Sequence, residues 1–574
     1  MPLPVFFAAK DQSVLLGNLQ SSGNLAIALL NKDETEPLGF FRLDLRRHTS
    51  FFLFLFSLLL FSPGLGARDL WAPVEPRYGE IVRVMFFTGE WLVPMVNGDL
   101  YTDKPILYFW VALIAAKITG GVSEWVVRVP AAIGGVGFVL ATFWIGRDLF
   151  NDRVGAIAAA VLATSLRVIW EARWAHVDML FAFFFLLSIY FGARTLLRRG
   201  GPNEILLAYV FMALATLTKG LIGIVLPGLI FLALAVARRD WWMIRAARPG
   251  AGLLLFLLVA APWFYLVSRA TAGQWLSDFI SIHHLQRYTT GTGHRQPFYY
   301  YLTTLPVDFL PWTVFLIPSL SVYRDYRRAW NQPQVQICLL WFLVVFIFFS
   351  LSETKRDLYL IPLLPTLAFL IANYFGDLER QDRIPNPLYP WITVMFFGAV
   401  AASGIALPLA ALIVRPDATW SLLPSCMVLG VGGSFTVVLS LRRRPLGAFI
   451  SVSLMMALLT ITVSLWFFPY LERFKSRRQF ARVISQIVPA SAPLYVYADI
   501  THDFNFYTQR TRIPVLETAA EVAGLRERRE KSYLLVKERD LKKGVPAIPP
   551  ELIIASDSPD QATWHLVEFN QRGR

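Results

Sequence analysis

Long apolar runs, separated by short polar segments, dominate the chain from residue 50 to residue 468. Each run approaches the roughly 20 residues that a helix needs to cross a bilayer, and the runs lack the helical or strand periodicity of a soluble fold. The pattern predicts an all-α polytopic membrane protein of about 13 spans. The predicted spans are residues 50–66, 126–146, 154–170, 177–195, 205–217, 221–237, 250–268, 300–320, 334–351, 357–375, 388–414, 420–441 and 447–468.

A further apolar stretch, residues 106–119, is short and contains Lys117, so it fits either a span or a helix in the membrane interface. Loop charges decide between the two, because Lys and Arg gather in cytoplasmic loops. If 106–119 does not cross, the alternate loops that share the cytoplasmic side with the N-terminus contain most of the loop arginines; if it crosses, they all lie outside. The interfacial reading, a cytoplasmic N-terminus and an external C-terminus are therefore predicted. The loop arginines are Arg147, Arg153, Arg194, Arg198, Arg199, Arg238, Arg239, Arg245, Arg248, Arg324, Arg327, Arg328, Arg380, Arg383, Arg442, Arg443 and Arg444. Arg42, Arg46 and Arg47 precede the first span and place the N-terminus in the cytoplasm.

The sequence changes character after about residue 470. Residues 493–499 and 532–537 read as strands, and residues 519–531 are charged and helix-prone. The predicted organisation is an N-terminal extension at 1–48 on the cytoplasmic side, a membrane domain at 49–470 with its first external loop at 68–125, and a small external α/β domain at 471–574. The extension lacks the ordered regions of a signal peptide.

Composition agrees with a membrane protein, since 55% of the residues are hydrophobic and 16% are charged. The net charge of +14 does not indicate nucleic-acid binding, because the basic residues lie mostly in loops between spans. Cys338 and Cys426 both lie in apolar runs, and neither suggests a disulfide framework or a Cys-based metal site.

With this topology, ionisable residues from separate loops gather on the external face, where ionisable groups at span ends mark a site or a polar pathway. Cations among acids suggest an anionic headgroup, most simply a phosphate. Each residue also has a structural alternative: Asp178 could cap a helix, Glu75 and Glu80 could lie on a solvated face, and Lys219 could be a snorkelling anchor. The gathered residues are Glu75, Arg77, Tyr78, Glu80, Asp103, Lys104, Glu171, Arg173, His176, Asp178, Lys219, His283, His284, Arg287, His294, Lys355 and Arg356.

Read in order, these segments resemble the bacterial aminoarabinose transferases, within the protein mannosyltransferase-like superfamily of GT-C glycosyltransferases. The resemblance covers about residues 50 to 375. It is carried by 70–85 (LWAPVEPRYGEIVRVM), 89–94 (GEWLVP), 97–98, 101–105 (YTDKP), 128–130, 146–150, 173–179, 217–220, 296–297, 311–312 and 352–365.

The resemblance implies a GT-C fold, two interfacial helices in the first external loop, and transfer of a sugar from a polyprenyl phosphate, commonly undecaprenyl phosphate. The acceptor would be a lipid such as lipid A, a glycan or a protein at the external face of the inner membrane. Matching positions would supply Glu75, Asp103 and Asp178 as catalytic groups and Arg77, Lys104 and Lys355 as donor-phosphate ligands. Further candidates are Tyr78, Glu80, Lys219, His284 and Arg287. No metal ligands are predicted, and the need for a divalent metal stays open because no spacing is diagnostic.

One position departs from the family pattern, because Val74 stands where many members carry the aspartate that is the usual candidate base. Glu75 could take over that role, the acceptor could already be an anion that needs no base, or the chain could be inactive. A transporter or flippase for a lipid-linked solute is the competing function. Transporters tend to show repeated halves, and the sequence shows no convincing internal repeat.

Overall fold

The computed structural model describes residues 48–286, 295–320, 330–381, 388–527, 530–544, 548–557 and 564–569. The chain forms two units, Met1–Thr49 and Ser50–Arg574, and the second contains the elements that bear on function. Apart from His48, the predicted N-terminal extension lies outside the described residues.

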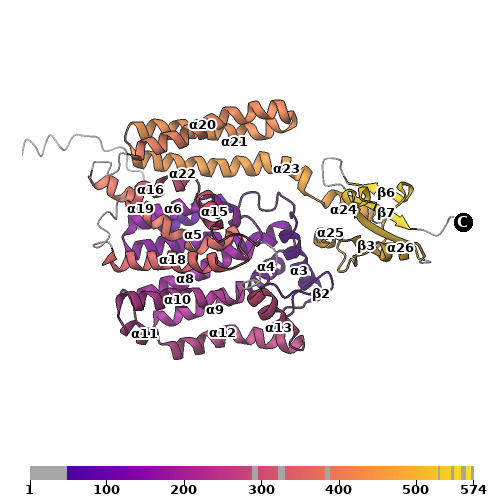
Figure 1. Cartoon of the computed structure of the whole chain (residues 1–574), viewed down its shortest axis with the longest axis horizontal. Helices are drawn as coiled ribbons and strands as arrows, with labels where there is room; N and C mark the ends of the chain where they lie inside the picture. Colours follow the sequence, from indigo (N-terminus) through magenta and orange to yellow (C-terminus); the bar gives the residue numbers. More distant parts are fainter. Residues whose placement is uncertain are drawn as a thin grey trace, which may run out of the picture. The chain divides into compact units, whose positions relative to one another are not determined.

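Helices make up the membrane domain (Figure 1). Among the described residues, 8 helical segments are long and apolar enough to cross a membrane, or up to 10 if each of two bent pairs is one span. The 8 segments are Glu124–Leu149 (α5), Val177–Leu196 (α8), Trp242–Ala270 (α11 and α12), Pro333–Leu351 (α18), Asp357–Gly376 (η4 and α19), Tyr389–Val414 (α20), Pro416–Leu441 (η5 and α21) and Pro445–Lys475 (α22, η6 and α23). The bent pairs are Asp152–Ala163 (α6) with Leu166–Ala172 (α7), at 67°, and Tyr300–Asp308 (α15) with Trp312–Ser319 (η2 and α16), at 104°.

The remaining predicted spans lie on shorter helices, namely Thr49–Phe61 (α2), Glu204–Lys219 (α9) and Ile222–Arg238 (α10). At about 1.5 Å per residue these helices are shorter than the roughly 30 Å hydrocarbon core. Each predicted span thus falls on a helix or a bent pair, while the total of thirteen stays a prediction.

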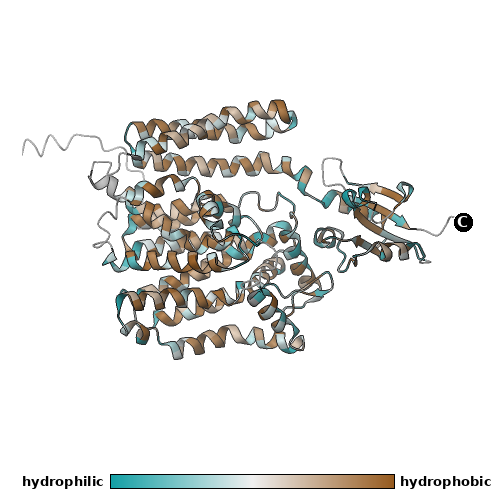
Figure 2. Ribbon diagram, in the orientation of Figure 1, coloured by the Kyte–Doolittle hydropathy of each residue, from teal (hydrophilic) through white to brown (hydrophobic). Residues whose placement is uncertain are grey.

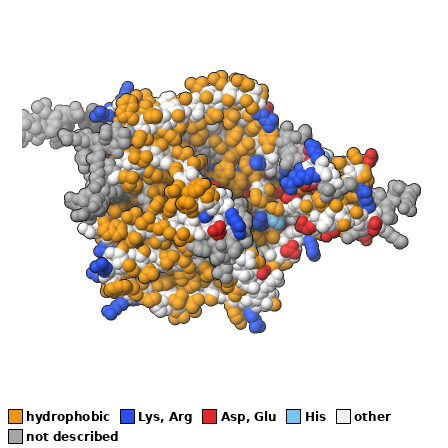
Figure 3. Space-filling model, viewed as in Figure 1, with side chains coloured by type: hydrophobic (Ala, Val, Ile, Leu, Met, Phe, Trp, Pro, Cys, Tyr) orange, Lys and Arg blue, Asp and Glu red, His pale blue; other side chains and the backbone are white. Residues whose placement is uncertain are grey.

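The outer surface of these helices is apolar, as the hydropathy colouring and the space-filling view show (Figures 2 and 3). Helices α20 and α21 are the extreme case: Leu407, Ile413 and Val431 are exposed, and little of either helix is buried against protein. Such a surface would be costly in water and is the expected one against lipid tails. The chain is therefore a multi-pass membrane protein.

The first external loop carries two helices, Val74–Thr88 (α3) and Leu107–Thr119 (α4), and a hairpin, Met95–Val96 (β1) with Asp99–Leu100 (β2). Asn97 and Gly98 turn the hairpin with φ of 55° and 84°, the positive values that an Asn-Gly hairpin turn needs. Helix α4 spans only about 20 Å, which is too short to cross a bilayer unaided and fits its predicted interfacial role.

Close helix contacts fix the polar ends of α8 and α9. Gly134 of α5 lies against the backbone of α8, where an added Cβ would stand 2.5 Å from the nitrogen of Leu180. Gly223 of α10 lies equally close to α9, where an added Cβ would stand 2.4 Å from the nitrogen of Thr216. These glycines hold the first turn of α8, with Asp178, and the last turn of α9, with Lys219, in fixed places.

The C-terminal domain is a five-stranded mixed sheet in the order β4-β3-β5-β7-β6. Strands β3 and β5 coincide with the two predicted strands, and α26 with the helix-prone segment, so the expected α/β domain is confirmed. The elements are Arg478–Ile487 (α24), Leu494–Tyr497 (β3), His502–Thr508 (α25), Val515–Leu516 (β4), Ala519–Glu527 (α26), Ser532–Lys537 (β5), Glu538–Lys542 (α27), Pro550–Leu552 (η7), Ile553–Ser556 (β6) and Trp564–Phe569 (β7).

This domain rests on the first external loop through α25, which packs against α3. The hydroxyl of Tyr507 accepts a 2.7 Å hydrogen bond from the backbone N–H of Leu70. The side chain of Asn97 bonds to the backbone of Ile513 and to Asn505. The loop and the C-terminal domain therefore lie on the same side of the membrane.

Candidate functional site

A polar cavity of about 490 Å³ opens beneath the first external loop, and we call it the polar cavity. Five separate segments line it: the start of α3, the segment after β2, the turn between α7 and α8, the end of α9, and the segment between α18 and η4. Its wall consists of Ala72, Pro73, Val74, Arg77, Tyr78, Tyr101, Asp103, Lys104, Arg167, Trp170, Glu171, Trp174, His176, Asp178, Lys219, Thr354, Arg356, Asp357, Leu358 and Tyr359. The structure thus brings together loops that the sequence placed on one face.

Helix α3 presents different residues to its two sides. Val74, Arg77 and Tyr78 line the polar cavity, whereas Glu75 does not and is fully buried. Successive residues of a helix differ by about 100° in direction, so neighbours in sequence face different surroundings. The proposed substitution of Glu75 for the missing base is therefore not supported by its position.

Glu75 instead anchors an ion-pair cluster with Arg68 and Arg128, which we call the Glu75 network. Its carboxylate accepts hydrogen bonds from Arg68 at 2.7 and 3.0 Å and from Arg128 at 2.7 and 2.9 Å. The backbone N–H groups of Trp71 and Ala175 donate two more, at 3.1 and 3.0 Å. Burial alone would raise the pKa of this carboxyl, but the two arginines hold it far below its ordinary value. A carboxylate held as an anion in this way is a poor proton acceptor.

Two guanidinium groups of the polar cavity, those of Arg77 and Arg356, have no recorded ion-pair partner among the residues that the structure describes. The Nε atom of Arg77 is buried without a hydrogen-bond acceptor. Arg77 also affects His502 of α25, whose pKa falls to about 4 through burial and the charge of Arg77. Unpaired cations on a cavity wall suit an anionic group such as a phosphate.

The lining carboxylates are all matched by cations. Asp178 pairs with Lys219 at 2.5 Å, and Asp103 pairs with Lys104 at 3.0 Å. Asp103 also lies 3.3 Å from Nδ1 of His283. Asp357 and Glu171 both contact Arg167. Each lining carboxylate thus contacts a cation, although Glu171 and Asp357 share the single charge of Arg167 with Asp308.

Known proteins resemble this chain in sequence and in structure. The family model described as dolichyl-phosphate-mannose-protein mannosyltransferase matches residues 103–266. An undecaprenyl phosphate-alpha-4-amino-4-deoxy-L-arabinose arabinosyl transferase of Pectobacterium atrosepticum is 30% identical over 372 residues, which are 62% of this chain and 64% of that protein. The protein of the same name from Shewanella sediminis is 26% identical over 492 residues, covering 82% of this chain and 86% of that protein. The chain thus spans slightly less than two thirds of the length of the Pectobacterium relative.

Solved structures match nearly the whole chain. ArnT from Cupriavidus metallidurans, bound to undecaprenyl phosphate, has a TM-score of 0.74 at 22% identity and covers 92% of this chain and 99% of that chain. The archaeal oligosaccharyltransferase AglB from Archaeoglobus fulgidus has a TM-score of 0.51 at 12% identity, covering 92% of this chain and 74% of that chain. The chain has the fold of the GT-C glycosyltransferases. The resemblance and the fold class expected from the sequence are thereby confirmed.

Several predicted residues have other places in the structure. Lys355 is buried, and its ammonium donates to the carbonyl oxygens of Gln296 and Ser352, at 3.1 and 2.5 Å, so Arg356 lines the polar cavity in its stead. Glu80 is buried in a bidentate pair with Arg83, at 2.7 Å for each contact, and does not line the cavity. The side chains of Lys355 and Glu80 are therefore engaged by contacts within the external segments.

The histidine segment after α13 (Gln274–Ile280) is described in part. His284 lies in the π-helix Ser281–Gln286 (η1), but its side chain is outside the described part, and Arg287 falls outside the described residues altogether. The described residues contain no group of three or more His, Cys, Asp or Glu side chains that could hold a metal ion.

The sequence analysis did not identify Arg167 or Asp357, and it placed Glu171 and His176 on the external face without assigning either a role. The structure places all four on the polar cavity. Glu171 lies in the last turn of α7 and His176 directly precedes α8, so their contact depends on the turn between the helices. A glutamate and a histidine on either side of a predicted loop at a span end were the available signal.

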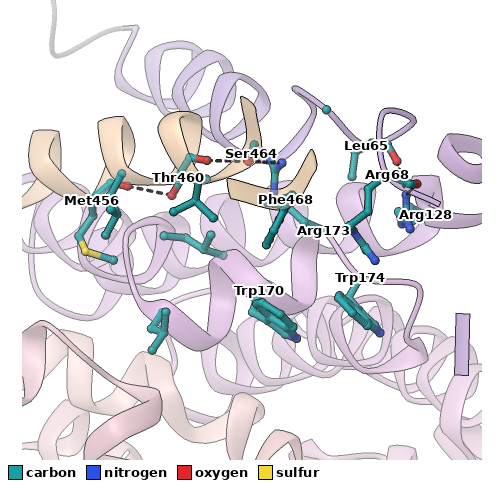
Figure 4. Close-up of a pocket in the computed structure, with 15 residues that line it drawn as sticks. Leu65, Arg68, Arg128, Trp170, Arg173, Trp174, Met456, Thr460, Ser464 and Phe468 are labelled. Atoms are coloured by element: carbon teal, nitrogen blue, oxygen red, sulfur yellow. Dashed lines mark hydrogen bonds between the residues drawn. The ribbon is translucent and has the colours of Figure 1, made fainter. Parts of the chain in front are cut away.

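An apolar crevice of about 160 Å³ adjoins the polar cavity, since Trp170 and Trp174 line both (Figure 4). The two rings stack with their centroids 4.8 Å apart. Met456 and Phe468 form the other wall of the crevice, and its polar end holds Arg173, whose guanidinium donates to Ser464 at 2.7 Å. Apolar and polar spaces thus meet at a wall of tryptophan, the residue type that favours membrane interfaces.

Proposed function

We propose that this chain is a membrane glycosyltransferase that moves a sugar from a polyprenyl-phosphate donor, most simply undecaprenyl phosphate, to an acceptor at the external face of the inner membrane. The observation that carries the proposal is the polar cavity, which lies beside an apolar crevice and in which Arg77 and Arg356 have no ion-pair partner within the described part of the chain. A lipid-linked phosphate needs a cationic surface for its phosphate and an apolar surface for its lipid tail. The named relatives, which act on undecaprenyl phosphate-linked aminoarabinose, and the structure of ArnT with undecaprenyl phosphate support the same donor class.

Arg77, Lys104 and Arg356 would hold the donor phosphate. When the bond between the sugar and the phosphate breaks, negative charge grows on the phosphate, and cations fixed beside it stabilise that charge. Asp103 and Asp178 would keep Lys104 and Lys219 in place through their ion pairs. The acceptor would be a lipid such as lipid A, a glycan or a protein.

The proposed arrangement in the membrane keeps the predicted boundaries, with residues 1–48 in the cytoplasm, a membrane domain at 49–470 and an external domain at 471–574. Lys542→Cys, in a chain that also carries Cys338→Ala and Cys426→Ala, should react with an impermeant maleimide on spheroplasts. Arg442→Cys in the same background is the matched cytoplasmic position. If Lys542→Cys reacts only after lysis, the topology is reversed.

Purified protein in nanodiscs should transfer the sugar of undecaprenyl phosphate-α-4-amino-4-deoxy-L-arabinose to lipid A, measured by mass spectrometry of the product. Lys104→Ala should abolish this transfer while the protein stays folded, because the ammonium lies at headgroup level on the cavity wall. Arg269→Ala, an exposed arginine at the end of α12, is the control. Near-normal turnover and donor affinity in Lys104→Ala would remove Lys104 from the phosphate site.

A transporter or flippase of a lipid-linked solute is the competing proposal, and an inactive chain is a third. The charged residues of the polar cavity lie at helix ends rather than at mid-span, which favours the enzyme. Product formation by purified protein identifies the enzyme. Movement of labelled undecaprenyl phosphate across a vesicle membrane without any product would instead identify the transporter.

A further inference from the structure

Glycosyl transfer to a hydroxyl group needs a proton acceptor, and the polar cavity lacks a free carboxylate for that role. Val74 supplies none, and Glu75 is enclosed in the Glu75 network. The lining carboxylates Asp103, Asp178 and Asp357 each have a Lys or Arg partner. A cation in contact stabilises the ionised carboxylate and weakens it as a base.

His176 differs from these groups. It lines the polar cavity, and its Nδ1 atom lies 2.8 Å from Oε2 of Glu171. Oε1 of Glu171 accepts from Arg167 at 3.2 Å, which holds the carboxylate in place as an anion. Because an ionised carboxylate can only accept, Nδ1 of the neutral ring carries the proton and Nε2 carries the lone pair. Among the described residues, Nε2 has no recorded partner.

We propose that His176, oriented by Glu171, is the general base that takes the proton of an acceptor hydroxyl in this cavity. The inference rests on the proposed glycosyl transfer. The acceptor oxygen forms a bond to the anomeric carbon, the bond between that carbon and the phosphate oxygen breaks, and the lipid phosphate leaves with the electron pair. The hydroxyl proton passes to Nε2, and the imidazolium is stabilised by Glu171 until the proton leaves to solvent. The acceptor is thus a hydroxyl-bearing glycan or lipid rather than a phosphate.

The charges around His176 suit a base that works near neutral pH. Burial alone would lower the pKa of His176, but the nearby carboxylate of Glu171 outweighs burial and raises it above its ordinary value. Asp178 acts in the same direction, and Arg356 acts against it. A base is most effective when its pKa lies near the working pH.

The first test compares two acceptors, lipid A and the same lipid A after removal of its phosphates, with undecaprenyl phosphate-α-4-amino-4-deoxy-L-arabinose as donor. His176→Gln should lower turnover onto the dephosphorylated acceptor by about 10²–10⁴-fold, the usual scale for a lost general base. Its affinity for undecaprenyl phosphate should stay unchanged. His565→Gln, in the sheet of the C-terminal domain, is the matched control.

The second test reads the pH dependence of kcat/KM. The base must be unprotonated, so the rate of the wild-type protein should fall as the pH drops through the pKa of His176. Glu171→Gln removes the largest influence that raises this pKa, so the acidic limb should move to lower pH. If Glu171 only stabilised the turn between α7 and α8, the rate would fall without a shift of the limb. This variant keeps the inference testable even if His176→Gln does not fold.

The outcomes separate this inference from the proposed function. Transfer by the wild-type protein only onto the phosphorylated acceptor would overturn the base and leave the glycosyltransferase standing. Unchanged turnover in His176→Gln would do the same. No transfer at all by folded wild-type protein onto either acceptor would overturn the proposed function itself.

Discussion

Two groups of buried charges lie on either side of α3, and they differ in how many of their charged groups already have ion-pair partners. In the Glu75 network, one carboxylate receives six hydrogen bonds from two arginines and two backbone groups. Glu75 itself lines neither the polar cavity nor the apolar crevice, although Arg68 and Arg128 line the crevice. In the polar cavity, Arg77 and Arg356 have no ion-pair partner among the residues that the structure describes, and Nε2 of His176 retains a lone pair. A buried charge that is fully compensated stabilises the fold, whereas leftover charge beside open space is available for a ligand.

The substitution Glu75→Gln is the strongest test of this difference between the two groups of charges. Loss of the negative charge leaves Arg68 and Arg128 buried without compensation, and breaking a buried pair in this way costs about 3–5 kcal/mol. We expect a large fall in the thermal unfolding midpoint in detergent, together with a similar loss of transfer onto every acceptor. Glu353→Gln, an exposed carboxylate, is the control. A stable Glu75→Gln protein with a selective loss of hydroxyl transfer would return Glu75 to the role of base.

Arg77→Ala probes the other side of the helix. A charge-assisted hydrogen bond contributes about 1.5–3 kcal/mol, so affinity for undecaprenyl phosphate should fall by about 10- to 100-fold. The unfolding midpoint should change little, because Arg77 has no ion-pair partner to lose among the described residues. Calorimetric titration of both variants tests the contrast directly. Unchanged affinity in Arg77→Ala, or a large loss of stability, would place Arg77 with the structural charges.

The sequence predicted the helices, the C-terminal sheet and the loops that meet at the polar cavity, because long apolar runs and loop charges are global signals. The sequence did not predict which of two neighbouring residues directs its side chain into the polar cavity. Glu75 follows Val74 on a helix and faces another side. Lys355 precedes Arg356, whose backbone is extended at φ −136° and ψ 142°, and neighbours in extended chain point to opposite sides. The contact of His176 with Glu171 required a turn whose geometry no local pattern specifies.

Val74→Asp tests whether the polar cavity can use an added base, because it places a carboxylate on the wall of that cavity. In a His176→Gln background, the new carboxylate should raise turnover onto a hydroxyl acceptor by about tenfold. That gain is a small part of the 10²–10⁴-fold, roughly, that a positioned base supplies. Recovery is expected to be partial because Arg77 lies one turn away on α3 and will pair with the new charge. Val74→Asn has a similar shape and no basic group, and it serves as the control. Equal recovery by both variants would show that polarity, rather than proton transfer, limits the rate.

The smallest effect is expected where charges are matched but exposed. Arg478 joins α24 to the first external loop through Asp69 at 3.0 Å and Glu124 at 3.1 Å, and its side chain is 40% exposed. Solvent screens such pairs, so Arg478→Ala should cost less than about 1 kcal/mol and leave transfer unchanged.

The neighbouring Arg477 pairs with Asp557 inside the C-terminal domain, where the two side chains are 12% and 5% exposed. Arg477→Ala should therefore lower the unfolding midpoint more than Arg478→Ala. If the order is reversed, burial does not decide the contribution of these charges, and the contrast between the Glu75 network and the polar cavity loses its physical basis.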